Sequence, residues 1–382
     1  MNHSKRLLIV VTYTAMFMLG LYLSMYQITL LNISEEYSID SVIRGSLVAV
    51  QFIGICIPPL FIAWLAGKTG KKNVLMFSMT ILVAGLLSVY LTNNLLCFII
   101  SIFFIGGGFS VTEATLSAAI SDEFPQNAQK HISFSQAMFS IGAFISPLVS
   151  EFLLNRGIRW KSLFLLCGVF FALLLVMLTF IKIEKSVIEY NASGSKDILG
   201  IIREKNFIFL ALTIFVYIGI EEIIGFFTDS YFNISVGAPG LGAVALSLYW
   251  AAMIPSRLIT GIVKMSHKKF IAICSIGITI SLVAAMLIPV NAVKLVLFAF
   301  SGLFCGPVWG LIMTSVAQQN SWNSAASMNF LVSVSGLGGA VFPFTAGILI
   351  SFSGEYSAYF LAAVAGILML IAFGASQKKQ KG

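Results

Sequence analysis

The chain has 382 residues, of which 58% are hydrophobic and only 10% are charged, with a formal net charge of +8 at pH 7. Soluble domains carry about 25% charged residues, so this composition excludes a soluble protein and makes lipid the solvent for most of the chain. The basic excess does not indicate nucleic-acid binding, because the Lys and Arg residues fall in short gaps between apolar runs, where they set membrane topology. The apolar runs are too long for the alternating strands of a β-barrel, so we predict an all-α polytopic membrane protein.

Twelve apolar runs are long enough to cross a membrane, which takes about 20 residues. In chain order they are 7–31, 44–66, 74–93, 95–119, 131–154, 162–182, 206–230, 242–264, 269–289, 292–317, 324–351 and 357–375. The first run is too long for a signal peptide and lacks a small-residue cleavage site, so we expect a retained span. The five cysteines lie inside these runs without CxxC spacing, and we expect small buried core residues rather than disulfides or metal ligands. They are Cys56, Cys97, Cys167, Cys274 and Cys305.

The polar segment 183–205 divides the spans into two groups of six. We therefore predict an N-terminal half at 1–182, a cytoplasmic linker at 183–205 and a C-terminal half at 206–382. With the N-terminus inside, the outer segments carry only Arg44, Arg156, Arg159, Lys161 and Lys294. Most other basic residues fall inside, so the positive-inside rule predicts that both termini are cytoplasmic. The basic cluster "NRGIRWK" is the exception to that rule.

Two groups of six spans joined by a cytoplasmic linker resemble the major facilitator superfamily, in which two six-helix halves rock about a midplane site. The loop "AWLAGKTGKKNVL" is similar to the loop signature of that superfamily, G-x-L-A-D-R-x-G-R-R. The matching residues are Leu65, Ala66, Gly70, Lys71 and Lys72. Gly67 stands where the family has Asp, which removes a charge contact between helices.

Four runs carry a narrower resemblance. They are "FVYIGIEEIIGFFTDSYF", "SLYWAAMIPSRLITG", "GLGGAVFPFTAG" and "GGGFSVTEATLSAAISDEFP". The residues that match are Phe215, Tyr217, Gly219, Glu221, Tyr249, Trp250, Arg257, Gly338, Gly339, Pro343, Gly347 and Glu113. These runs resemble the fucose:proton symporter family, which implies proton-coupled sugar transport. That family has an Asp in its first helix where this chain has Gln27, which puts the mode of coupling in question.

Acidic residues inside the spans are the main candidates for proton coupling, because a carboxylate at the bilayer centre costs about 2.5–3.5 kcal/mol even on lenient scales. Glu113 is the first candidate, and the alternative is a protonated Glu that only packs against a neighbouring helix. Glu221 and Glu222 are the second candidates, and they point about 100° apart on a helix. We expect one to face the central cavity and the other to meet a polar partner. Asp229 is expected to be solvated near the outer surface.

Arg257 is the predicted charge partner in the second half. It either pairs with Glu221 or Glu222, or extends to the inner surface as a snorkelling side chain. Amide and aromatic side chains complete the predicted sugar site, although each could equally be a buried packing group. They are Tyr22, Gln27, Gln51, Gln136, Tyr249, Trp250, Trp309 and Asn329.

We therefore predict a secondary transporter of the inner (plasma) membrane that moves a small polar solute, in the first instance a monosaccharide, by proton symport. The alternative is proton-driven efflux of drugs or amphipathic metabolites. The expected partners are the sugar-like solute, protons and the lipid bilayer, and we expect a monomer that binds no nucleic acid. An enzyme is not expected, and neither is a cofactor or a metal, because the three His residues form no cluster within a span and the sequence has no nucleotide-binding loop.

Overall fold

The computed structural model describes residues 3–58, 60–61, 68–181, 204–260, 265–317 and 324–376. Every regular element in these ranges is a helix. The helices form two compact units, the first made of residues 1–37 and 50–190 and the second of residues 38–49 and 191–382. Most of the predicted linker, 183–205, lies outside the described ranges.

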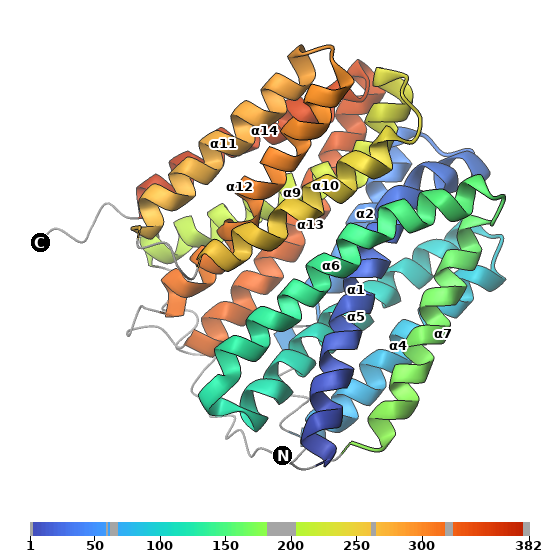
Figure 1. The fold of residues 1–382 in the computed structure, drawn as a ribbon, viewed down its shortest axis with the longest axis vertical. Helices are drawn as coiled ribbons and strands as arrows, with labels where there is room; N and C mark the ends of the chain where they lie inside the picture. Colours follow the sequence, from blue (N-terminus) through green and yellow to red (C-terminus); the bar gives the residue numbers. More distant parts are fainter. Residues whose placement is uncertain are drawn as a thin grey trace, which may run out of the picture. The chain divides into compact units, whose positions relative to one another are not determined.

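Among the described residues, the first unit contains six helices and one short 3₁₀ turn. They are α1 (His3–Glu36), the later part of α2 (Ser41–Cys56), α4 (Lys71–Leu91), α5 (Leu95–Glu123), η1 (Pro125–Asn127), α6 (Ala128–Asn155) and α7 (Trp160–Thr179). α1 packs along α6 and also contacts α7, while α4 packs on both α5 and α7 (Figure 1).

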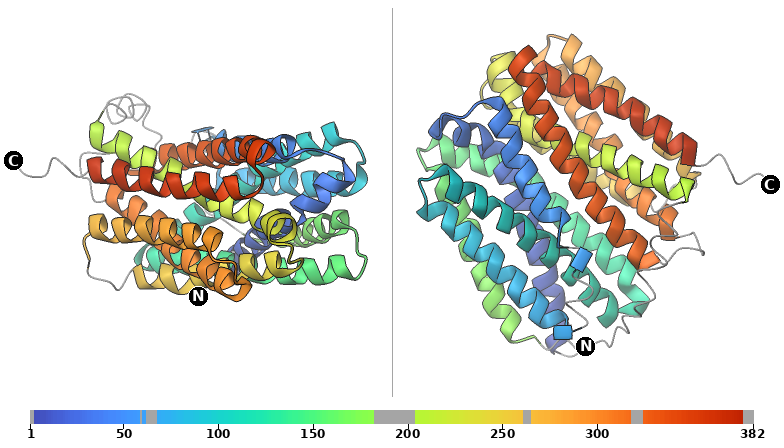
Figure 2. Two further views of the ribbon diagram at one scale, coloured as in Figure 1. Left: turned by 90° about the horizontal axis from the view of Figure 1, so that it is seen from above. Right: turned by 180° about the vertical axis from the view of Figure 1, so that it is seen from behind.

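The second unit repeats this arrangement. It consists of the first part of α2 with α9 (Lys205–Ser230), the π-helical extension η2 (Tyr231–Val236), α10 (Leu241–Thr260), α11 (His267–Leu287), α12 (Asn291–Ala317), α13 (Ser324–Ser353) and α14 (Tyr356–Ser376). α9 packs on α13 and α14, and α11 packs on α12 and α14 (Figure 2). When six helices are counted from α1 and six from α9, the first helix of each set packs on the fifth. The third helix of each set packs on the fourth and on the sixth. This correspondence is an internal structural repeat.

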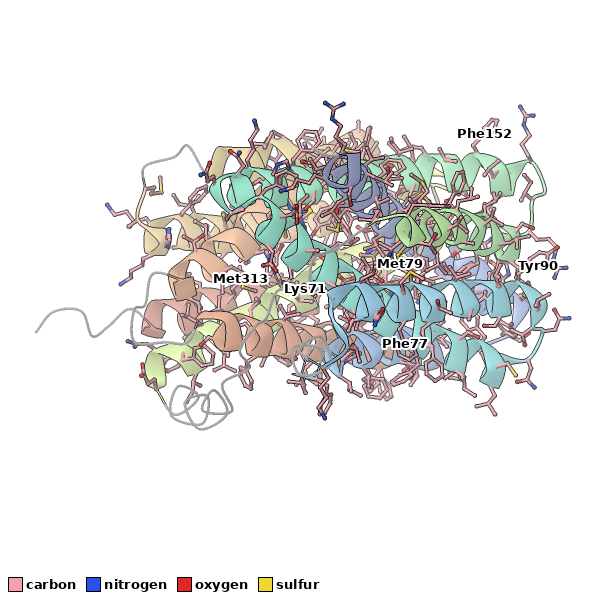
Figure 3. All side chains as sticks on the ribbon, turned by 90° about the horizontal axis from the view of Figure 1, so that it is seen from below. Lys71, Phe77, Met79, Tyr90, Phe152 and Met313 are labelled. Atoms are coloured by element: carbon pink, nitrogen blue, oxygen red, sulfur yellow. The ribbon has the colours of Figure 1, made fainter. Side chains whose placement is uncertain are left out.

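Eleven of the described helices are long and apolar enough to span a membrane. They correspond to eleven of the twelve predicted spans, and the all-α polytopic fold is confirmed. The predicted span 44–66 corresponds to α2, a shorter apolar helix of 16 residues, and part of that run lies outside the described residues. Many large apolar side chains are exposed on the helices, among them Phe77 and Phe152 (Figure 3), as contact with lipid requires.

Four of the five cysteines are buried, but Cys97 is exposed. The expectation of a buried side chain is wrong at this position. Cys97 lies in the first turn of α5, where its neighbour Leu96 is exposed as well. An apolar run in a membrane protein therefore does not imply burial within the protein, because lipid covers apolar side chains equally well.

Glycines allow the first and fifth helices of each unit to approach closely. A Cβ atom on Gly142 of α6 would overlap the carbonyl oxygen of Phe17 of α1. In the second unit a Cβ atom on Gly338 of α13 would overlap the carbonyl oxygen of Phe215 of α9. Small residues at such crossings let helix backbones pack in lipid, where no hydrophobic force drives helices together.

Replacing Gly142 with alanine is expected to lower the thermal stability of the purified protein in detergent. Alanine favours an isolated helix by about 1 kcal/mol, but overpacking against a backbone costs about 1–3 kcal/mol. Gly374→Ala is the matched control, because a Cβ atom at Gly374 has nothing within 4 Å. If both variants melt alike, the close approach of α1 and α6 does not contribute to stability.

The basic cluster "NRGIRWK", the exception to the positive-inside rule, has an acidic partner, Glu36, at the end of α1. Lys161 Nζ lies 2.6 Å from Glu36 Oε1 and donates to Asn93 Oδ1 at 2.8 Å. Trp160 Nε1 donates to Glu36 Oε2 at 2.6 Å. Because Lys161 is buried beside this carboxylate, it is part of the structure that ties α1 to α7 rather than a free topological charge.

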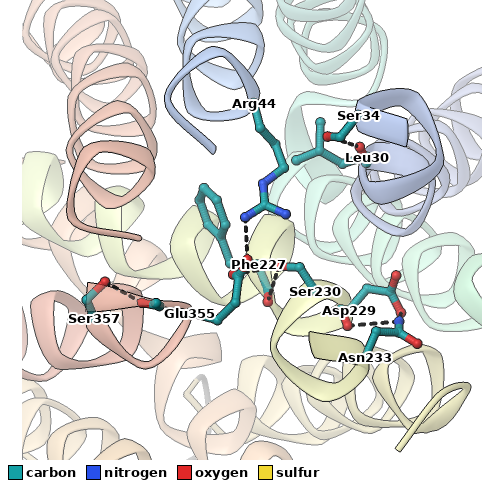
Figure 4. A network of polar contacts seen from close by, with 10 residues as sticks. Leu30, Ser34, Arg44, Phe227, Asp229, Ser230, Asn233, Glu355 and Ser357 are labelled. Carbon is teal, nitrogen blue, oxygen red and sulfur yellow. Dashed lines mark hydrogen bonds and ion pairs between the residues drawn. The ribbon is translucent and has the colours of Figure 1, made fainter. Parts of the chain in front are cut away.

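Arg44 is also not a loop charge. It lies inside α2, and its Nη2 atom is 2.5 Å from Glu355 Oε1, with 5% and 4% of the two side chains exposed (Figure 4). Ser230 Oγ donates to Glu355 Oε2 at 2.8 Å. The Arg44 guanidinium carbon lies 5.3 Å from the centre of the Phe227 ring. All four residues belong to the second unit, where they form a buried polar contact.

Candidate functional site

An ion pair between α9 and α10 is the centre of the candidate site in the second unit. Arg257 Nη2 lies 3.8 Å from Glu221 Oε1, and the exposed fractions of the two side chains are 22% and 7%. Of the two alternatives that the sequence leaves open for Arg257, the structure has the pairing with Glu221. A buried charge beside an opposite charge at this distance is strongly stabilised relative to the same charge alone.

Two buried tyrosines flank this ion pair. Tyr217 lies one helical turn before Glu221 on α9, so the two side chains share a face. The Tyr217 hydroxyl interacts electrostatically with Glu221, Cys305 and Arg257, and the Tyr249 hydroxyl with Cys305, Glu221 and Tyr217. The nearest polar partner is Glu221 for the Tyr217 hydroxyl and Cys305 for the Tyr249 hydroxyl, although neither contact meets strict hydrogen-bond geometry. A buried hydroxyl without a well-formed hydrogen bond costs about 1–3 kcal/mol, so both hydroxyls are candidates for ligand contact.

Sequence reasoning did not select Tyr217 or Cys305 as site residues. A signal for Tyr217 is present, because a residue four positions before an intramembrane acid lies on the same helix face. Cys305 is brought to Tyr249 by two glycines four residues apart on α12. A Cβ atom on Gly302 would overlap the carbonyl oxygen of Tyr249, and one on Gly306 would overlap the Ser256 hydroxyl.

The first unit contains an acid–amide contact between α5 and α6. Gln136 Nε2 donates to Glu113 Oε1 at 3.2 Å, and both side chains are partly buried. Glu113 lies ten residues before the end of α5, which is about 15 Å along the helix axis. The sequence selects these two residues for different roles, and the structure brings them together.

Other polar side chains of the first unit are buried deeply. Gln27 of α1 and Gln51 of α2 are both almost fully enclosed. Within the described part of the chain, neither amide atom of Gln51 has a hydrogen-bond partner, and the same is true of the Tyr22 hydroxyl. The Tyr22 ring stacks near Tyr26 and lies 6.3 Å from the Phe109 ring. Buried groups of this kind carry the desolvation cost noted above and are therefore candidates for ligand contact.

The remaining predicted residues occupy different environments. Glu222 and Trp250 are buried, and the Trp250 ring centre lies 5.6 Å from that of Tyr249. Trp309 is partly exposed on α12, which continues as a helix through Pro307. The side chain of Asn329 lies outside the described residues.

The expectation that Asp229 is solvated is wrong. Asp229 is buried, and Asn233 Nδ2 donates to its Oδ1 atom at 2.9 Å. The reason is that the helix does not end at residue 230 but continues through η2 to Val236. A Cβ atom on Gly242 would meet the Asp229 carboxylate, which therefore lies against the first turn of α10, where unpaired backbone N–H groups favour negative charge.

Near the end of the bundle where α4 begins, the loop signature residues contact neighbouring helices. Lys71 forms an ion pair with Asp122 of α5. Lys72 Nζ donates to the carbonyl oxygens of Thr179 and Ile181 at 2.9 and 2.7 Å, at the end of α7. Leu65, Ala66 and Gly67 lie outside the described residues.

Two curated relatives match most of the chain. A protein TsgA homolog from Buchnera aphidicola is 22% identical over 322 residues, covering 82% of this chain and 80% of that protein. The glucose/mannose transporter GlcP of Bacillus subtilis is 24% identical over 313 residues, covering 77% of this chain and 75% of that protein.

Solved transporter structures share the fold. A point mutant of the nucleoside transporter NupG superimposes with a TM-score of 0.81 at 15% identity, covering 98% of this chain and 100% of that one. A D-xylose-proton symporter gives a TM-score of 0.76 at 14% identity, covering 96% of each chain. The family model described as Major Facilitator Superfamily matches residues 10–319. The chain therefore belongs to the major facilitator superfamily and is a multi-pass membrane transporter.

Proposed function

We propose that the protein carries a monosaccharide by proton symport through alternating access in the inner (plasma) membrane. The observation that supports this most directly is the Gln136–Glu113 contact inside the span region of α5 and α6. Intramembrane acids are candidate functional residues by default, and proton relay is one of their known roles. In this proposal both termini are cytoplasmic, the two halves are 1–182 and 206–382, and the protein acts as a monomer without a cofactor.

Gln136 suits a partner that changes its protonation state. A side-chain amide offers both donors and an acceptor, so it can hydrogen-bond a carboxylate and a carboxylic acid alike. Protonation of Glu113 from outside then favours sugar binding, and loss of the proton to the cytoplasm releases both. The other acids kept as candidates for proton coupling are Glu221 and Glu222, since both are buried in α9.

The sugar assignment rests on residue chemistry and on the relatives. Amides, carboxylates and aromatic side chains are the groups that bind sugar hydroxyls and ring faces, and this chain places them in both units. Gln51 and Tyr22 in the first unit and Tyr217 and Tyr249 in the second are buried and have no well-formed hydrogen bond among the described residues. The glucose/mannose transporter GlcP supports the same class of solute for this chain.

We expect the external pH to rise when the transported sugar is added to de-energised, lightly buffered cells that overexpress the protein. The panel contains glucose, mannose, xylose and the nucleoside uridine, and cells with an empty vector and cells treated with a protonophore are the controls. A rise with one sugar that both controls lack supports sugar:proton symport. A rise with uridine alone, or no response to the whole panel, contradicts the sugar assignment, and in the latter case efflux of amphipathic compounds is tested next.

A further inference from the structure

The acid sites at Glu113 and Glu221 differ in the side chain that faces the acid. Glu113 faces the neutral amide of Gln136. Glu221 faces the guanidinium of Arg257 on α10, and the Tyr217 and Tyr249 hydroxyls and the Cys305 thiol lie within electrostatic range of Glu221. A permanently charged guanidinium favours the ionised form of a neighbouring carboxyl. If the carboxyl were protonated, the cation inside the protein would lose its partner, which costs several kcal/mol.

We propose that Glu221 is a fixed carboxylate that binds substrate hydroxyls together with Tyr217 and Tyr249, that Arg257 positions it, and that it does not carry the transported proton. This inference rests on the proposed function and removes Glu221 from the proton-coupling candidates. Arg257 acts through Glu221 and is a positioning residue.

The donors and acceptors of this cluster match a neutral, hydroxyl-rich solute. Glu221 accepts hydrogen bonds, whereas each tyrosine hydroxyl can donate and accept. Adjacent hydroxyls of a sugar likewise donate and accept, so they can satisfy the carboxylate and both buried phenols at once. The ion pair has no net charge, and an uncharged solute therefore enters without an unpaired charge.

The test compares sugar exchange with uphill accumulation in proteoliposomes, using radiolabelled glucose, mannose and xylose. Exchange requires binding and translocation but no net proton movement, whereas accumulation requires the coupled proton. Glu221→Gln is expected to raise KM for exchange at least about tenfold, because a hydrogen bond to a charged group is replaced by one to a neutral amide. Accumulation at saturating sugar is expected to persist, because in this proposal Glu221 does not carry the transported proton.

Conservative variants separate a binding role from a folding defect. Tyr217→Phe and Tyr249→Phe are each expected to raise KM by about two- to tenfold, the range for one neutral hydrogen bond. Tyr359→Phe is the matched control, because Tyr359 is equally buried but already donates to Thr228 Oγ1 at 3.0 Å. Arg257→Lys keeps the positive charge and is expected to retain a KM closer to the wild type than Arg257→Gln does.

The outcomes distinguish this inference from the proposed function. If Glu221→Gln keeps the wild-type KM for exchange but loses accumulation, Glu221 carries the proton and the inference is overturned while symport stands. If Tyr359→Phe changes KM as much as the two cluster variants, the effect is structural and the binding role of the tyrosines is rejected. If wild-type protein exchanges none of the three sugars, the proposed function fails before any variant is compared.

Discussion

Replacing Glu113 with glutamine is expected to abolish uphill accumulation of sugar while leaving exchange largely intact. Glutamine preserves the size of the side chain and its contact with Gln136, but it cannot bind and release a proton. With one proton per sugar, an inward gradient of one pH unit supports about tenfold accumulation, because about 1.4 kcal/mol corresponds to a factor of ten. The variant is expected to stop at equal concentrations. Radiolabelled uptake into proteoliposomes with an imposed pH gradient measures the difference.

Glu123→Gln is the matched control for this substitution. Glu123 lies on the same helix, but at its end, where it forms an ion pair with Lys5 at 2.8 Å. Its removal is expected to leave accumulation unchanged, because ion pairs that are partly exposed at a helix end contribute little. A Glu113→Gln protein that still concentrates sugar against its gradient eliminates Glu113 as the proton carrier, and Glu222 becomes the next acid to test.

The spans and the fold class follow from the sequence because lipid imposes a simple requirement. Every backbone polar group in the bilayer must be paired internally, so each apolar run of sufficient length becomes a helix. The same requirement does not fix where a helix ends. Hydropathy ends the seventh span at residue 230, whereas the helix continues through η2 to Val236 and thereby buries Asp229.

Charged residues near span ends were the least predictable from the sequence. The positive-inside rule treats Arg44 and Lys161 as loop charges. In the structure each finds a carboxylate from a distant part of the chain, Glu355 for Arg44 and Glu36 for Lys161. Hydropathy contains no information about such partners, because the contact depends on how helices that are remote in sequence pack together.

The candidate site was partly predictable for a related reason. Intramembrane polarity alone selects Glu113, Gln136, Glu221 and Arg257, since each is costly in lipid. It does not give their pairing, because that depends on the relative depth of α5 with α6 and of α9 with α10. That depth is set by close helix packing. One example is the approach of Gly302 on α12 to the carbonyl oxygen of Tyr249 on α10. The sequence does not reveal which residues meet in such contacts.

Replacing Arg44 with methionine is expected to destabilise the protein by about 3–5 kcal/mol, the cost of leaving a buried charge without its partner. Glu355 would then keep only the hydroxyl of Ser230 among the contacts shown in Figure 4. The measurement is the thermal unfolding of the purified protein in detergent, with exchange activity as a second readout. Arg156→Met is the matched control, because Arg156 is exposed and its guanidinium carbon lies 4.8 Å from the centre of the exposed Phe152 ring. A surface substitution of this kind is expected to change stability by no more than about 0.5 kcal/mol.

The double variant Arg44→Met with Glu355→Met distinguishes a charge effect from lost packing. Removing both charges leaves no unpaired ion, so the double variant is expected to be more stable than Arg44→Met alone. Ser230 keeps a partner in that protein, since its single hydroxyl proton is then donated to the carbonyl oxygen of Phe227, 3.1 Å away. If the two substitutions instead add their separate costs, the Arg44–Glu355 contact has no coupling energy and the fold relies on the packing of α2 around Gly45. That packing is itself close, because a Cβ atom on Gly45 would lie 3.2 Å from the Cα atom of Gly347 on α13.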